Sequence, residues 1–300
     1  MREKSTEMIT IKQNSISNDI LRNFNCIRDI DNGDINSLGA YEIQTERGTL
    51  QMEIEPFELE KIQRKLKYSN LKKLFLYFLY RMNMDNKRTF NLDLNELLDF
   101  KGQARRTENI KRLLDDLKEL EKIKVTNYQA LINNKECQLK ESFLFKCEKW
   151  VEESSNIYSY FSVTAGAWAK PLLNNNHYAF IPRDIFTFNK LEIDIAYNII
   201  LRFINERSDL INNSNKFSLS VKSVLKNVEL NTHKYGSTKM IDKIERVLDK
   251  LEELGWFSWD YRKSDRTQLP GRNKLRCYKK FMIDFNCKYS TLIKSSKYTH

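Results

Sequence analysis

The chain has 300 residues, and its 51 Lys and Arg residues outnumber 40 Asp and Glu residues, for a formal net charge of +11. Hydrophobic residues make up 41% of it and charged residues 30%, which excludes an intrinsically disordered protein and suits two folded domains. The excess of positive charge favours a polyanionic partner such as nucleic acid, although solubility alone would also explain it.

The sequence lacks the motifs of several functional classes. Residues 1–20 have no apolar core of a signal peptide, and the longest apolar run, 74–80, is too short to span a bilayer. No C-x-x-C pair is present and the three histidines are isolated, so we expect no metal and no cofactor. The glycines form no phosphate-binding loop, and spacing suggests no catalytic triad. We therefore expect a cytoplasmic protein that is not an enzyme.

Residues 1–55 form an N-terminal extension that is left unassigned. Short strands are predicted at 8–11 and 50–54. The acidic run 29–34 resembles a calcium-binding loop, but its twelfth position is Ala40, where a glutamate ligand is needed. We interpret this run as an ordinary polar loop.

The next stretch has the pattern of a helix-turn-helix. A buried helix is predicted at 70–84, and a strand follows at 90–92. Asp93 is then expected to cap a short helix, with Glu96 completing a capping box.

A longer helix and several strands complete this block. The turn 101–106 leads to the helix, which Thr107 is expected to cap. Strands at 125–131 and 138–151 are predicted to form its hairpin, or wing, and a further strand is predicted at 157–163.

The same order of elements returns after a connector, and we place the domain boundary near residue 170. A strand at 217–219 leads to a short helix that Ser220 opens. After a polar turn at 231–236, a long helix begins at Ser237 or Thr238.

The second block ends in a basic hairpin. Strands are predicted at 256–261 and 275–285, and the tip between them is rich in Arg and Lys. Residues 261–281 contain eight Lys and Arg residues but only one acidic residue, Asp265.

The two blocks match at fixed spacings, which indicates an internal duplication. At an offset of 127, the matched pairs are Phe90/Phe217, Leu92/Leu219, Leu94/Val221, Leu97/Val224 and Leu98/Leu225. At an offset of 131, they are Ile110/Ile241, Leu113/Ile244, Leu117/Leu248, Leu120/Leu251 and Ile123/Leu254. The four extra residues fall in the turn, where insertions are tolerated.

Placing the apolar stripe of each long helix inward predicts which residues face a ligand. Basic side chains there can bind guanine edges or phosphates, although a merely solvated helix surface would look similar. In the first block the candidate DNA-binding residues are Arg105, Arg106, Asn109, Lys111 and Arg112. In the second block they are Lys234, Thr238, Lys239, Lys243 and Arg246, with Arg266, Arg272 and Lys274 on the hairpin.

Strand, helix, turn, helix and hairpin, repeated on a basic chain, resemble the replication initiators of theta-replicating plasmids, the Rep family. The segments 90–125 and 217–261 and the lead-in 178–186 carry this resemblance. It implies an α+β fold of two tandem winged helix-turn-helix domains. The implied domains are 56–169 and 170–287, followed by a basic tail at 288–300.

The resemblance also implies a function. Rep proteins bind repeated double-stranded DNA sites, or iterons, at a plasmid origin. A dimeric form often represses its own gene, monomers recruit host replication proteins, and the N-terminal domain commonly holds the dimer contact. Three alternatives stay open: a winged-helix transcriptional regulator, a replication accessory protein of a phage or mobile element, and a winged-helix scaffold for protein contacts.

Overall fold

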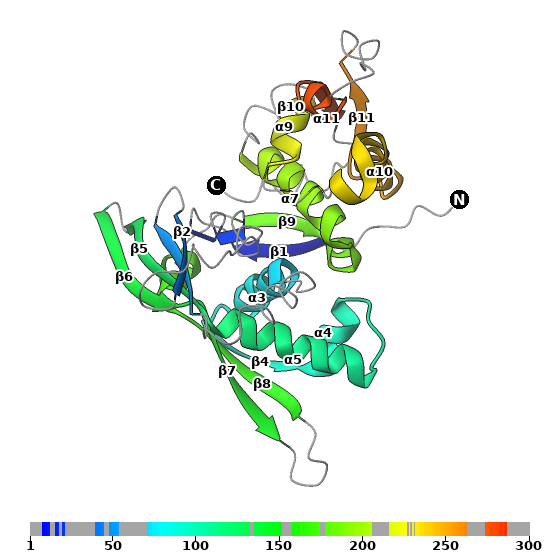
Figure 1. The fold of residues 1–300 in the computed structure, drawn as a ribbon. Helices are drawn as coiled ribbons and strands as arrows, with labels where there is room; N and C mark the ends of the chain where they lie inside the picture. Colours follow the sequence, from blue (N-terminus) through cyan, green and yellow to red (C-terminus); the bar gives the residue numbers. More distant parts are fainter. Residues whose placement is uncertain are drawn as a thin grey trace. The chain divides into compact units, whose positions relative to one another are not determined.

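The computed structural model describes residues 8–12, 16–17, 20–21, 40–44, 48–53, 71–132, 135–151, 158–174, 178–205, 216–226, 228, 230, 232–262 and 274–286. Helices and strands are combined in it, which confirms the mixed α and β class (Figure 1). The chain divides into a first unit, residues 9–179, and a second unit, residues 180–300 with 1–8. This division lies later than the boundary expected near residue 170. Among the described helices, none is both long enough and apolar enough to cross a membrane.

The first unit contains a helix, a strand, two helices and a strand pair in this order. They are α3 (Leu71–Asp85), β4 (Thr89–Asp93), α4 (Leu94–Phe100), α5 (Thr107–Glu121), β7 (Phe145–Val151) and β8 (Tyr158–Ala165). The three strands form an antiparallel sheet in the order β4-β8-β7. The alternating burial of β4 places Phe90 and Leu92 in the core, where Phe90 meets Phe78 of α3.

A second sheet in this unit corrects the predicted wing. It has the order β2-β3-β5-β6 and consists of β2 (Ala40–Gln44), β3 (Thr49–Glu53), β5 (Ile123–Ile132) and β6 (Lys135–Phe143). The hairpin predicted as the wing is therefore β5–β6 of another sheet, and β7–β8 is the strand pair beside β4. Two strands of the second sheet also come from the N-terminal extension, to which sequence patterns assigned no domain.

The physical cause of the wrong wing is a change of sheet at Leu144, inside the predicted strand 138–151. Leu144 is buried, and its N–H donates to the Ile123 carbonyl at 2.8 Å. Its carbonyl accepts hydrogen bonds from Gly166 N–H and from Trp168 Nε1. Gly166 is needed there, because a Cβ would lie 1.9 Å from the Phe143 carbonyl oxygen.

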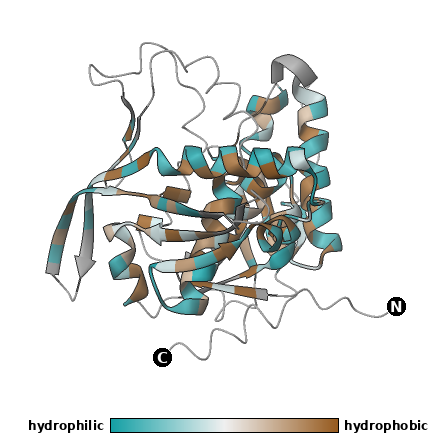
Figure 2. Cartoon of the chain, turned by 90° about the horizontal axis from the view of Figure 1, so that it is seen from below, coloured by the Kyte–Doolittle hydropathy of each residue, from teal (hydrophilic) through white to brown (hydrophobic). Residues whose placement is uncertain are grey.

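The second unit repeats the order of elements. It contains α7 (Lys190–Asn205), β10 (Lys216–Ser220), α9 (Val221–Val224), α10 (Thr232–Glu253), β11 (Ser258–Tyr261) and β12 (Met282–Asn286). Its sheet has the order β10-β12-β11 and is antiparallel. The order of elements and the order of strands therefore agree between the units. Figure 2 shows hydrophilic and hydrophobic stretches along the same helices, as expected where a helix buries one face.

Most of the remaining short elements precede or connect these blocks; they are β1 (Met8–Lys12), η4 (Ala167–Ala169), α6 (Lys170–Leu173), β9 (Tyr178–Pro182) and η5 (Arg183–Thr187). Helix α11 (Lys274–Tyr278) lies between β11 and β12.

Three local predictions about the helices are confirmed. Asp93 caps α4, because its carboxylate accepts the Asn95 N–H at 2.8 Å, and Ser220 caps α9 through the Ser223 N–H. Gly236, with φ of 71°, interrupts α10 and marks the start of the long helix. The turn predicted at 231–236 is wrong for residues 232–235, which are helical.

Three other local predictions are wrong. Thr107 is the first helical residue of α5, and Arg106 occupies the N-cap position. Glu96 binds Arg81 rather than completing a capping box. The predicted strand 275–285 begins instead as helix α11, whose turn allows Tyr278 to be buried and to meet Tyr261.

Candidate nucleic-acid interface

Helix α5 presents a basic face opposite its apolar stripe. Leu113, Leu117 and Leu120 are buried, whereas Lys111 and Arg112 are exposed. This is the arrangement that the helical period predicts for a helix that packs one face against the core. The preceding turn adds Arg105 and Arg106, both also exposed.

Polar contacts define the shape of this turn. The Asn109 side-chain amide donates to the Ala104 carbonyl at 2.8 Å, and Arg105 lies 3.2 Å from Asp99. The Arg105 and Asp99 side chains are 60% and 59% exposed, so this ion pair holds Arg105 only weakly and leaves it accessible to an anion. Asn109, expected to contact DNA, is partly buried and helps to fix the turn.

A buried ion pair fixes the corner between α4 and α5. Lys101 Nζ lies 3.3 Å from Asp116 Oδ2, and the two side chains are 5% and 10% exposed. Two charges so far from water must stay together, because separating them would leave one buried and uncompensated. The pair therefore holds the exposed face of α5 in a fixed orientation relative to α4.

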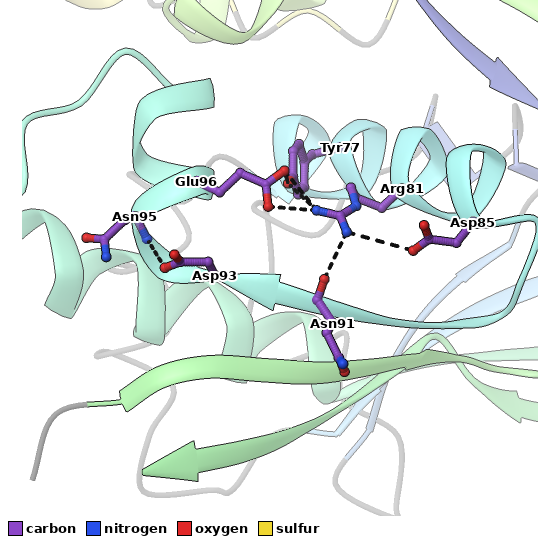
Figure 3. Close-up of polar contacts among 7 residues, drawn as sticks. All are labelled: Tyr77, Arg81, Asp85, Asn91, Asp93, Asn95 and Glu96. Carbon is purple, nitrogen blue, oxygen red and sulfur yellow. Dashed lines mark hydrogen bonds and ion pairs between the residues drawn. The ribbon is translucent and has the colours of Figure 1, made fainter. Parts of the chain in front are cut away.

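Helix α4 is held from its other end by a polar cluster around Arg81 (Figure 3). Arg81 Nη1 lies 2.7 Å from Glu96 Oε2, and its Nη2 donates to the Asn91 carbonyl at 3.1 Å. The Tyr77 hydroxyl donates to Glu96 at 2.8 Å, and burial raises the pKa of Tyr77, which therefore stays neutral. These contacts join α3, β4 and the first turn of α4.

Helix α10 has the corresponding face in the second unit. Ile241, Ile244 and Leu248 are buried. The outward positions predicted from sequence are exposed or half-buried; they are Thr238, Lys239, Asp242, Lys243 and Arg246. This face of α10 carries three cations and one acid (Lys239, Lys243, Arg246 and Asp242), whereas the corresponding positions of α5 carry two cations and two acids (Lys111, Arg112, Glu108 and Asp115). The face of α10 is therefore the more basic of the two.

A tyrosine pair ties α10 to the hairpin of the second unit. The Tyr261 hydroxyl of β11 donates to Glu245 of α10 at 2.5 Å and lies 2.7 Å from the Tyr278 hydroxyl of α11. Burial, the neighbouring Tyr278 and the bond to Glu245 raise the pKa of Tyr261, and burial raises that of Tyr278. Both tyrosines therefore stay neutral, and they hold an acidic side chain of the helix that carries Lys243 and Arg246.

Not every predicted contact residue falls within the described part of the second unit. Lys274 begins α11 and is half-buried. Arg266 and Arg272 lie outside the described residues, as does the side chain of Lys234. Arg262, at the end of β11, is exposed and lies 3.6 Å from Asp284.

Sequence reasoning missed two cations of the first unit. Lys146 and Lys149 of β7 are exposed, and they lie on the strand pair that occupies the place expected for the wing. Between them, burial raises the pKa of the Cys147 thiol to about 12, with the Glu121 carboxylate adding to the effect. Cys147 is therefore an unreactive thiol. The alternation of polar and apolar residues along 145–149 was the available signal for this strand.

In the described part of the chain, no group of three His, Cys, Asp or Glu residues is placed to hold a metal ion. No protein-family model matches the chain, and no curated protein matches it.

Two solved structures are similar in their general arrangement. A crystal structure of selenomethionine derivatives of domains 2 and 3 of RctB matches 90% of this chain and 99% of that chain, with a TM-score of 0.46 and 11% sequence identity. A second crystal structure of RctB domains 2–3 matches 85% of this chain and 93% of that one, with a TM-score of 0.47 and 11% identity.

Proposed function

We propose that the chain is a sequence-specific double-stranded DNA-binding protein built from two winged helix-turn-helix units related by duplication. We propose further that it acts as a plasmid replication initiator at repeated origin sites. The observation that carries DNA binding is the common placement of two basic helices. Each of α5 and α10 follows a short helix, precedes two of the three strands of an antiparallel sheet, and exposes cations opposite a buried stripe. The DNA major groove admits one α-helix, and a helix so placed is the reading element of a helix-turn-helix.

The strand pairs after these helices supply a second kind of contact. Lys146 and Lys149 in the first unit, and Arg262 and Lys274 in the second, lie on or beside the strands that follow the reading helix. Cations on such hairpins bind phosphates, which adds affinity and fixes orientation without reading bases.

The two reading faces differ, and this favours an initiator over a one-site regulator. At an offset of 131, the exposed Glu108 and Lys111 of α5 correspond to Lys239 and Asp242 of α10, so the charges are reversed. Two unlike helices on one chain suit a non-palindromic site, and copies of such a site can be arranged as direct repeats. A regulator that binds as a symmetric dimer usually reads a palindrome with two copies of one helix.

Repression of its own gene and contact with host replication proteins belong to the proposal as the Rep resemblance implies them. Repression would follow from binding at repeats near the coding gene.

The test is binding of the purified chain to duplexes from the DNA that flanks its gene. Tandem, non-palindromic repeats are expected there, and each should bind more tightly than a scrambled duplex of equal length. Arg112→Ala and Lys243→Ala should each weaken cognate binding by about 1–3 kcal/mol and reduce the preference over scrambled DNA. The exposed Lys87→Ala and Lys216→Ala, which remove one charge from each unit away from α5 and α10, are the matched controls and should bind like wild type.

A second arm tests whether both units read one duplex. Inserting about half a helical turn between the two halves of the site should sharply weaken binding, because one reader would then face away from its groove. Unchanged binding would show that a single unit contacts DNA, and equal binding to scrambled DNA would contradict sequence-specific recognition.

A further inference from the structure

The outward positions in the first turns of α5 and α10 carry opposite charges. Thr107 begins α5, and at the offset of 131 it corresponds to Thr238, which follows the break at Gly236. Where α5 then has an acid, α10 has a base, and three residues later the order is reversed. The exposed pairs are Glu108/Lys239 and Lys111/Asp242.

The two acids of these pairs, Glu108 and Asp242, are accessible to a ligand. Arg112 follows Glu108 by four residues, and Arg246 follows Asp242 by four, which is the spacing of an ion pair within a helix. Among the described residues, however, none forms a hydrogen bond or an ion pair with either carboxylate. Their oxygens are therefore available to accept hydrogen bonds from a molecule outside the chain.

An acid on a face that meets DNA needs a donor, because a carboxylate close to phosphates otherwise lowers affinity. In the major groove, cytosine offers its N4 amino group, whereas guanine offers the acceptors O6 and N7. Adenine also offers an amino group, but the acceptor N7 lies beside it and repels a carboxylate. Glu and Asp therefore favour cytosine, and Lys favours guanine.

The spacing of these charged residues fits neighbouring base pairs. Residues three apart on a helix share one face and differ by about 4.5 Å along its axis. Successive base pairs are about 3.4 Å apart. The N-terminal residues of a reading helix are also those that contact base edges. The charges of one helix can thus reach two base pairs of its half-site, the part of the DNA that one unit reads.

We propose that Glu108 and Asp242 are specificity-determining residues, each of which accepts a hydrogen bond from a cytosine amino group in the major groove. These roles rest on the proposed DNA binding and specify which bases are read. The base pair that faces Glu108 presents cytosine, where the one that faces Lys239 presents guanine. The base pair that faces Lys111 presents guanine, where the one that faces Asp242 presents cytosine. The two half-sites therefore differ by an exchange of cytosine and guanine at two positions.

The experiment is a selection by the full chain from duplexes with about 25 randomised base pairs, or just over two helical turns, followed by sequencing of the bound DNA. Wild type should enrich one non-palindromic site. Glu108→Lys gives α5 the charge that α10 has at the corresponding position, so one preferred base should change from cytosine to guanine in one half-site. Lys239→Glu should change guanine to cytosine in the other half-site.

The second pair of positions gives an independent result. Asp242→Lys should change cytosine to guanine, and Lys111→Asp should change guanine to cytosine, each in the half-site of its own unit. The double variant E108K/K111D copies the charges of α10 onto α5 and should make the half-sites alike at both positions. Base preferences are compared rather than affinities, because reversing a charge changes the attraction to phosphates for every sequence.

Glu108→Ala separates base reading from simple repulsion. Loss of an accepted hydrogen bond should weaken binding to the enriched duplex by about fivefold or more, and should remove the preference at one base pair. An acid that merely repelled phosphates would give the opposite sign, because its removal would strengthen binding to every duplex.

The matched controls reverse one exposed charge in each unit away from α5 and α10. They are Glu136→Lys in β6 and Lys216→Glu in β10, and both should enrich the wild-type site. Exchange variants that keep every wild-type base preference would overturn the proposal while DNA binding stands. The same holds if Glu108→Ala binds as wild type does, or binds all duplexes more tightly. A wild type that enriches no sequence would instead contradict sequence-specific binding itself, and this inference with it.

Discussion

The residues near the corner between the two consecutive helices differ in chemistry between the units, at α4–α5 in the first unit and α9–α10 in the second. In the first unit, Lys101 and Asp116 form a buried ion pair. At the offsets that align the two blocks, the corresponding residues of the second unit are Val228 and Val247, of which Val247 is buried. Positions that carry a buried ion pair in the first unit thus carry two apolar residues in the second, where Val228 is half-buried. The ion pair adds a directional constraint, whereas a valine contributes through the burial of its apolar surface.

The largest expected effect on stability comes from removing one partner of this ion pair. Asp116→Val should lower the free energy of unfolding by about 3–5 kcal/mol, because Lys101 is left buried without its partner. The double variant Lys101→Val with Asp116→Val copies the second unit and should recover most of the loss. Urea unfolding of the three proteins measures both values. Equal destabilisation by the single and the double variant would show that the two charges are not coupled.

The next prediction tests whether the apolar stripes of the two units are equivalent. Leu117 of α5 and Leu248 of α10 correspond at an offset of 131, and both are buried. Leu117→Ala and Leu248→Ala should each destabilise by about 2–5 kcal/mol, by similar amounts. The measurement is again chemical unfolding. A change below about 0.5 kcal/mol at either site would contradict the correspondence.

Each unit also has a tyrosine bonded to a glutamate, and the comparison predicts unequal effects. Tyr261→Phe removes a hydroxyl that donates to Glu245 at 2.5 Å, and should cost about 1.5–3 kcal/mol of stability. Tyr77→Phe should cost less, about 0.5–1.5 kcal/mol, because Arg81 still binds Glu96. Combining Tyr261→Phe with Glu245→Gln should reduce the cost of the first change. Additive losses in this double-mutant cycle would mean that the short hydrogen bond contributes little.

The smallest effects are expected from cations that follow α5 and α10 in the sequence. Lys146→Ala with Lys149→Ala in the first unit, and Arg272→Ala with Lys274→Ala in the second, should weaken cognate and scrambled DNA about equally. For every phosphate that is no longer neutralised, the slope of log K against log salt should become shallower by about 0.9. Titrations at several salt concentrations measure this. A selective decrease of cognate binding would instead indicate that a hairpin reads the width of a minor groove.

Sequence patterns predicted those features whose causes lie within a few residues. The caps Asp93 and Ser220 and the break at Gly236 depend on local backbone geometry, and the structure confirms them. The buried and exposed faces of α5 and α10 follow from the helical period alone.

The errors arose where a distant residue decides the outcome. Glu96 has the spacing of a capping box, but Arg81 and Tyr77, brought close by α3, bind it instead. The Asn109 amide donates to the Ala104 carbonyl of the turn, and its contact with DNA stays a prediction.

The wing was misassigned for a similar reason. Phe143, Leu144 and Phe145 form a continuous apolar run without glycine or proline, which is compatible with one uninterrupted strand and so does not indicate the change of sheet. The burial of Tyr278 against Tyr261 similarly favours a helical turn over the continued strand.

Leu144 has a mechanical consequence for this protein. It is a single residue between β6, which ends at Phe143, and β7, which begins at Phe145, and its backbone is bonded on both sides. No loop separates the two strands, so a displacement of β6 is transmitted directly into the strand that carries Lys146 and Lys149. The junction at Leu144 therefore couples the position of the four-stranded sheet to the position of the strand pair that carries these two cations.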